Sequence, residues 1–140
     1  IPLEGSTHQD LHADYQRPLF EELPDLQLPA YMMVVSFPLT RIQLEDGPIE
    51  IVPGTHRLPR EAVSPIEPVL LDPGDVLVRH PWTLHRGTPN RTSRPRLLCT
   101  IRYTRRWYWD SSRDVSTIPE DIWLSLTPVQ REMMRFPYSS

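Results

Sequence analysis

Residues 72–90 read DPGDVLVRHPWTLHRGTPN, and this stretch decides the fold that we expect. Its Pro-Gly-Asp turn starts the apolar run Val76–Val78, which predicts a buried β-strand, and a short loop then leads the chain back toward His85. His80 directly precedes a proline, and this restricts it to an extended or turn conformation. We therefore expect His80 to be structural and His85 to be available for chemistry.

The neighbouring segments also predict strands. The apolar run Tyr31–Pro38 is typical of a central strand buried on both faces, and short strands are expected over Ile49–Val52 and Pro68–Leu71. From Arg96 to Tyr103 the sequence alternates, so that two sets of side chains lie on opposite faces of one strand. We expect a packing face of Leu97, Cys99, Ile101 and Tyr103, and a second face of Arg96, Leu98, Thr100 and Arg102.

The segment His8-Gln9-Asp10-Leu11-His12-Ala13-Asp14 contains the pattern His-x-Asp twice. In an extended strand residues 8, 10, 12 and 14 share one face, so either pair could chelate an ion together with His85. Two imidazoles and one carboxylate form the ligand set that holds non-haem Fe(II) and leaves other positions open. We favour His12 and Asp14, because Leu11 precedes this pair and Tyr15 follows it; His8 and Asp10 remain the alternative.

Arg96 follows His85 by eleven residues, which allows a tight turn and a return into the next strand. Burying an arginine without an anionic partner is costly, so this face of the strand either meets solvent or lines a pocket that receives a carboxylate. A guanidinium is suited to that task because it is a permanent charge with a planar fork of donors.

Composition restricts the classes of function. All 15 basic residues are Arg, so a lysine nucleophile within this chain is excluded. A net charge of −3 and a pI near 5.9 argue against a nucleic-acid partner. No apolar run approaches membrane-spanning length and no signal peptide is visible, so we expect no membrane partner and a cytoplasmic location. The sequence does not indicate whether the protein forms oligomers.

Four segments in this order resemble the phytanoyl-CoA dioxygenase family of Fe(II)- and 2-oxoglutarate-dependent oxygenases: HADYQRPLF, EDGPIEIVPGTHR, DPGDVLVRHPWTLHRGTPN and RPRLLCTIRY. The resemblance implies a mainly β fold, a double-stranded β-helix of the jelly-roll or cupin-like kind. We expect residues 1–140 to form a single oxygenase domain, with the barrel over about 8–104 and an aromatic and helical tail over about 105–140. The tail should contain a helix from the capping box at Thr127 to about Phe136. Family members carry helices and strands upstream of the metal motif, so the N-terminal part of the barrel is expected to be missing here.

The resemblance also implies roles for particular residues. The metal ligands fall on His12, Asp14 and His85, although some members carry a string that registers His8 and Asp10 instead. The 2-oxoglutarate-binding arginine falls on Arg96. To these we add Thr88 or Thr100 as a hydroxyl that assists Arg96. Two further residues are candidates for substrate binding: Arg102 and Trp107.

The predicted activity is hydroxylation or desaturation of a small organic substrate by O₂, with Fe(II) as cofactor and 2-oxoglutarate as co-substrate. One alternative is a non-catalytic cupin-like module that binds small molecules. Another is a metal-dependent cupin enzyme that does not use 2-oxoglutarate. Both alternatives lack a role for Arg96 beside an open metal site.

Overall fold

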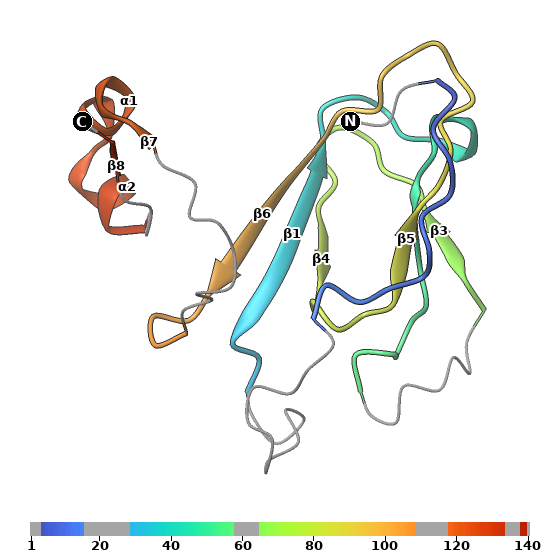
Figure 1. Cartoon of the computed structure of the whole chain (residues 1–140), viewed down its shortest axis with the longest axis horizontal. Helices are drawn as coiled ribbons and strands as arrows, with labels where there is room; N and C mark the ends of the chain where they lie inside the picture. Colours follow the sequence, from blue (N-terminus) through green and yellow to red (C-terminus); the bar gives the residue numbers. More distant parts are fainter. Residues whose placement is uncertain (1–3, 16–28, 58–64, 109–117, 134–137, 140) are drawn as a thin grey trace. The chain divides into compact units, whose positions relative to one another are not determined.

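The apolar run MMVVSFP forms strand β1 (Met32–Pro38), the central strand of a three-stranded antiparallel sheet. A computed structural model describes residues 4–15, 29–57, 65–108, 118–133 and 138–139. In this sheet β1 lies between β4 (Leu77–Arg79) and β6 (Leu98–Thr104), as Figure 1 shows. The register places Val34 between Arg79 on one side and Arg102 on the other.

The two faces of this sheet differ in burial. On β1 the side chains of Met32, Val34, Ser36 and Pro38 are buried, whereas the alternate side chains are half-buried. The apolar run predicted a strand buried on both faces, and this prediction is wrong: only one face of β1 is fully buried. The expected packing face of β6 is also wrong in part, because Ile101 and Tyr103 are 43% and 49% exposed. Alternation separates the two faces of a strand but does not say which of them the fold covers.

The expectation of a buried strand before His85 is also wrong in part. Strand β4 is present, but Val76 and Val78 are 57% and 54% exposed, and Arg79 is the buried residue of the segment. Arg79 shares the buried face with Val34 and Ser36, because Val34 is its partner across β1 and β4. The covered face of this sheet therefore carries polar groups as well as apolar ones.

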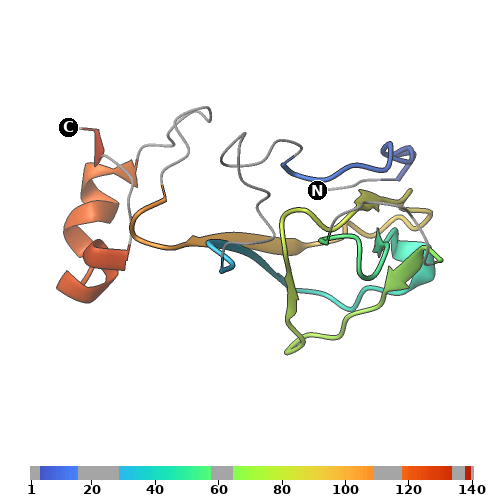
Figure 2. The ribbon, with the colours of Figure 1, turned by 90° about the horizontal axis from the view of Figure 1, so that it is seen from below.

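The second sheet has the order β3-β2-β5 and is also antiparallel. Its strands are β3 (Glu67–Val69), β2 (Ile49–Ile51) and β5 (His85–Gly87). A short 3₁₀ turn, η2 (Leu44–Asp46), precedes β2. The N-terminal segment, blue in Figures 1 and 2, runs beside β5 and joins it through an antiparallel bridge between His12 and His85. This arrangement brings the beginning of the chain next to the second histidine.

Residues 106–140 form a separate unit from residues 1–105. It contains β7 (Ile118–Pro119), α1 (Glu120–Ser125), α2 (Pro128–Met133) and β8 (Tyr138–Ser139), with β7 and β8 parallel. The capping box before α2 is confirmed, since Thr127 N donates to Gln130 Oε1 at 2.8 Å and Gln130 N donates to Thr127 Oγ1 at 3.3 Å.

The sequence did not predict α1, and the expected end of the last helix near Phe136 lies outside the described residues. No helix within the described ranges is both long and apolar enough to cross a membrane. That the whole chain forms one oxygenase domain stays a prediction.

Candidate metal centre

The two histidines of the predicted site face each other across neighbouring extended segments. His12 N donates to His85 O at 3.0 Å, and His85 N donates back to His12 O at 2.8 Å. A further bond from Asp14 N to Pro81 O, at 3.0 Å, fixes the carboxylate-bearing end of the segment. The centroids of the two imidazole rings are 4.5 Å apart. Backbone pairing alone therefore places both rings and the aspartate in one location.

An irregularity in the pairing separates the two His-x-Asp patterns. Continuing the regular register from the bridged histidines would make Asp10 the partner of Gly87. Instead Gln9 N donates to Gly87 O at 3.0 Å, and Gly87 N donates to the Gln9 side chain at 2.9 Å. One additional residue is accommodated between Gln9 and His12, as in a β-bulge, and this breaks the alternation of faces.

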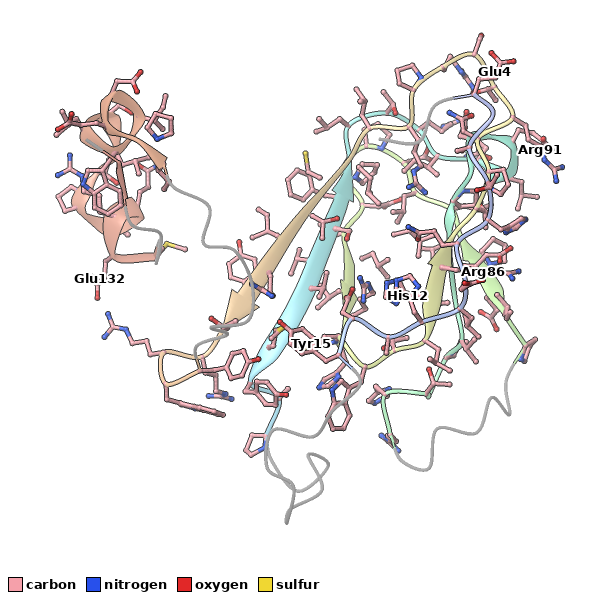
Figure 3. The ribbon with its side chains drawn as sticks, in the orientation of Figure 1. Glu4, His12, Tyr15, Arg86, Arg91 and Glu132 are labelled. Carbon is pink, nitrogen blue, oxygen red and sulfur yellow. The ribbon has the colours of Figure 1, made fainter. Side chains whose placement is uncertain are left out.

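The expectation that residues 8, 10, 12 and 14 share one face is therefore wrong for the first two. His8 instead lines a surface hollow together with Glu50 and Arg91. Figure 3 shows His12 on the side of its segment that faces β4. The structure brings His12 and Asp14 to His85, and it does not bring His8 or Asp10 there.

Three side chains converge on a point suitable for an ion. One ligand atom each from His12, Asp14 and His85 lies within 4.8 Å of the others, and this is the one such group of His, Cys, Asp or Glu within the described residues. His85 Nε2 lies 3.7 Å from Asp14 Oδ1. Two ligands at about 2.1 Å from a common ion can be at most about 4.2 Å apart, so shifts below an ångström close the site.

The hydrogen bonds of the two rings fix which nitrogen is available. His12 Nδ1 bonds to the carbonyl of Asp10 at 2.7 Å, and His85 Nδ1 bonds to the carbonyl of Thr83 at 2.9 Å. A carbonyl only accepts hydrogen bonds, so both Nδ1 atoms carry the proton and both Nε2 atoms keep a lone pair. This is the orientation that outer hydrogen bonds give to metal-binding histidines.

Electrostatics favour the neutral form of His85. Burial lowers the pKa of His85 below its usual value of 6.5, and the positive charge of Arg79 lowers it further. The ring is therefore neutral at neutral pH, and a neutral ring is the form that binds a metal. Arg79 is 8% exposed, and its Nη1 donates to Asp14 Oδ2 at 2.8 Å. Sequence reasoning gave Arg79 no role; its only signal was an arginine at the end of an apolar strand.

Arg96 lies near the opposite end of β2 and β5 from the histidines. The ladder pairs Ile51 with His85 and Ile49 with Gly87, and Arg96 donates through Nη1 to the carbonyl of Gly47, two residues before Ile49. Burial lowers the pKa of Arg96 below its usual value, and its Nε is buried without a hydrogen-bond partner among the described residues. This half-buried cation therefore retains a donor for an anion.

A buried carboxylate anchors the loop that leads to Arg96. Asp46 Oδ2 accepts from Gln43 N at 2.9 Å, while Oδ1 accepts from Thr92 Oγ1 at 3.2 Å and from Arg94 Nη2 at 3.1 Å. The Gln43 backbone N–H is the main cause that lowers the pKa of Asp46 below 3.8, and burial opposes this effect. Asp46 therefore ties the turn before β2 to the loop before β6.

The remaining predicted residues lie in different settings. Thr88 Oγ1 donates to the carbonyl of Pro48 at 2.7 Å, so its proton is engaged. Thr100 Oγ1 lies 3.0 Å from the hydroxyl of the buried Ser36, which the sequence analysis missed. Arg102 donates to Tyr15 Oη at 2.6 Å and so reaches the residue after Asp14. Trp107 is exposed and belongs to the second unit.

Comparisons with known proteins show what the chain is similar to. A family model described as phytanoyl-CoA dioxygenase matches residues 2–98. The chain is 26% identical over 141 residues to the iron/alpha-ketoglutarate-dependent dioxygenase okaE of Penicillium ochrochloron, a match that covers 94% of the chain and 45% of that protein. It is 28% identical over 133 residues to the dioxygenase lolE1 of Epichloe uncinata, covering 77% of the chain and 52% of that protein. The chain thus spans about half the length of these relatives.

Among solved structures, AviO1 of Streptomyces viridochromogenes superposes with a TM-score of 0.60 at 24% identity, over 75% of the chain and 47% of AviO1. This likeness concerns the fold, and it confirms the predicted mainly β, cupin-like class. The match to the family model covers more than half of the sequence, including the segment of His12 and Asp14 and the strand of His85. The chain therefore belongs to the phytanoyl-CoA dioxygenase family.

Proposed function

We propose that the protein is an Fe(II)- and 2-oxoglutarate-dependent oxygenase whose iron is held by His12, Asp14 and His85. The observation that carries the proposal is the convergence of two Nε2 lone pairs and one carboxylate, since both Nδ1 atoms are tied to backbone carbonyls. Two imidazoles and one carboxylate suit Fe(II) and leave the other positions of the ion to small molecules. When bound, the iron and 2-oxoglutarate supply the oxidising chemistry that activates O₂.

The contribution of the chain is to bind, orient and exclude water. Backbone pairing holds the two rings, and burial of His85 keeps it neutral and ready to bind metal. In our proposal Arg96 binds the distal carboxylate of 2-oxoglutarate, and its buried Nε supports this role. Arg96 donates to the carbonyl of Gly47 and Thr88 Oγ1 donates to the carbonyl of the next residue, Pro48, so both side chains are tied to the turn before β2.

For the oxidised substrate we propose a small organic molecule that is hydroxylated or desaturated. Arg102 lies on the same face of the sheet as Arg79, in the row that runs through Val34, and reaches Tyr15 beside the metal cluster. It is exposed, so we assign it a contact with a polar or anionic group of the substrate. Thr100, paired with the buried hydroxyl of Ser36, is the hydroxyl that we propose near 2-oxoglutarate. The substrate role of Trp107 stays a prediction.

Anaerobic equilibrium dialysis of Fe(II) tests the metal assignment on the intact protein. His12→Ala and His85→Ala should each lose metal, because each removes one of three ligands. His8→Ala is the matched control, since His8 lies in the surface hollow and should leave the affinity unchanged. If His8→Ala is as damaging as His12→Ala, the assignment of ligands is wrong.

The same preparation separates the oxygenase from its alternatives. We expect 2-oxoglutarate to bind the Fe(II)-loaded protein and to bind the His85→Ala variant poorly. A non-catalytic module would show no metal dependence. A cupin enzyme of another kind would bind the metal and ignore 2-oxoglutarate, and either outcome would overturn the proposal.

A further inference from the structure

Arg79 is a nearly buried cation directly beside the candidate ligand Asp14. It ends strand β4, its side chain is 8% exposed, and its partner across the sheet is the buried Val34. Its Nη1 donates to Asp14 Oδ2 at 2.8 Å, while Nε is buried and has no hydrogen-bond partner among the described residues. Because a buried guanidinium without an anion is strongly destabilising, this ion pair is expected to persist.

The pair makes the two oxygens of Asp14 unequal. Oδ2 accepts the charge-assisted hydrogen bond from Arg79, whereas Oδ1 lies 3.7 Å from His85 Nε2. A carboxylate that ligates an ion through both oxygens must turn both toward it. For Asp14 that motion would break a 2.8 Å ionic hydrogen bond and leave a buried cation unpaired.

We propose that Arg79 is a positioning residue that restricts Asp14 to coordination through Oδ1 alone, and so preserves the coordination positions that the other reactants need. This inference rests on the proposed function. An octahedral ion with three protein ligands keeps about three open positions, and a second oxygen from Asp14 would occupy one of them. When bound, 2-oxoglutarate and O₂ would need the positions that a second oxygen of Asp14 would otherwise occupy.

The proposal predicts that metal affinity and 2-oxoglutarate affinity change in different directions when Arg79 is neutralised. Arg79 brings a positive charge close to a dication, and removing that charge favours metal binding. Releasing Oδ2 also allows Asp14 to bind through both oxygens, which further favours the metal and disfavours 2-oxoglutarate. A residue that only maintained the fold would instead weaken both affinities together.

The test uses the intact protein loaded with Mn(II), with Arg79→Met as the neutral variant of similar length. We expect Mn(II) to bind at least as tightly as to the parent protein and 2-oxoglutarate to bind about tenfold or more weakly. Relaxation of water protons by the bound Mn(II), which reports exchangeable metal-bound water, should show about one water fewer in the variant without 2-oxoglutarate. The water measurement separates a change in coordination from a general loosening of the site.

Two further variants keep the proposal testable. Arg79→Lys retains the charge and can still donate to Asp14, so it should keep part of the 2-oxoglutarate affinity of the parent protein. This variant can be measured even if Arg79→Met fails to fold. Arg86→Met is the matched control: Arg86 is half-buried and paired with Glu50 at 2.7 Å, and alternation along β5 puts it on the face opposite to His85. It should change neither affinity nor water count.

The possible failures are distinguishable. If the parent protein binds Mn(II) but not 2-oxoglutarate, the proposed function fails. If the parent binds both and Arg79→Met equals it in affinities and water count, or loses both affinities equally, the role of Arg79 in positioning Asp14 is wrong while the proposed function stands.

Discussion

Replacing Arg96 by alanine should selectively weaken 2-oxoglutarate binding. Arg96 is half-buried, its pKa is lowered by burial, and its Nε is left without a partner among the described residues. Removing one partner of such a charged pair costs about 2–5 kcal/mol. At about 1.4 kcal/mol for each factor of ten, the requirement for 2-oxoglutarate should rise about 30-fold or more. Arg96→Lys keeps the charge and loses the planar fork, so its 2-oxoglutarate affinity should lie between those of the parent protein and Arg96→Ala.

Arg94→Ala is the matched control for this experiment. The Arg94 side chain is 76% exposed, and its pair with Asp46 at 3.1 Å is of the surface type, worth about 0.2–1 kcal/mol. Its loss should therefore change 2-oxoglutarate affinity less than about fivefold. Affinities are measured by titrating 2-oxoglutarate into the anaerobic Fe(II) protein, with Fe(II) affinity and thermal unfolding recorded for each variant. Equal effects of Arg94→Ala and Arg96→Ala would refute the assignment of Arg96 to the co-substrate.

Further predictions concern stability. Asp46→Asn should lower the free energy of unfolding by about 1–3 kcal/mol at neutral pH, because it weakens the hydrogen bonds that this buried carboxylate accepts from Gln43 and Arg94. Because the pKa of Asp46 in the folded state lies below 3.8, its carboxylate stabilises the fold above that pH, and this stabilisation is lost as the pH falls further. The difference in unfolding free energy between Asp46→Asn and the parent protein, measured by urea unfolding, should therefore shrink below about pH 4. Val52→Ala should lower the free energy of unfolding by about 1.5–3 kcal/mol, since Val52 is fully buried. Val76→Ala, at a residue that is 57% exposed, should change it by no more than about 0.5 kcal/mol. Equal losses of stability in thermal melts would contradict this placement of the core.

The strands were predictable because their patterns are local. The runs around Val34 and Ile49 and the alternation around Thr100 all became strands close to the expected bounds. The coverage of their faces was not predictable, because it depends on which other element packs there. Ile101 illustrates this point, since it alternates like a core residue and yet is exposed.

The candidate site shows a similar division. The residue types and the long separation of Asp14 and His85 were readable from the sequence, but the choice between two His-x-Asp patterns depended on a one-residue irregularity next to Gly87. Such an irregularity arises from pairing with a distant strand, so local alternation cannot reveal it. Arg79 escaped notice for the same reason, because its partner is 65 residues away in the sequence.

An anaerobic titration of the Fe(II)-loaded protein with 2-oxoglutarate, monitored by visible absorption, tests whether this site holds both iron and the co-substrate. We expect a metal-to-ligand charge-transfer band for the parent protein and for His8→Ala, no such band for His85→Ala, and a band that needs more 2-oxoglutarate for Arg96→Ala. If the folded, iron-loaded parent protein shows no band, or if His85→Ala shows an unchanged band, the assignment of the site is wrong.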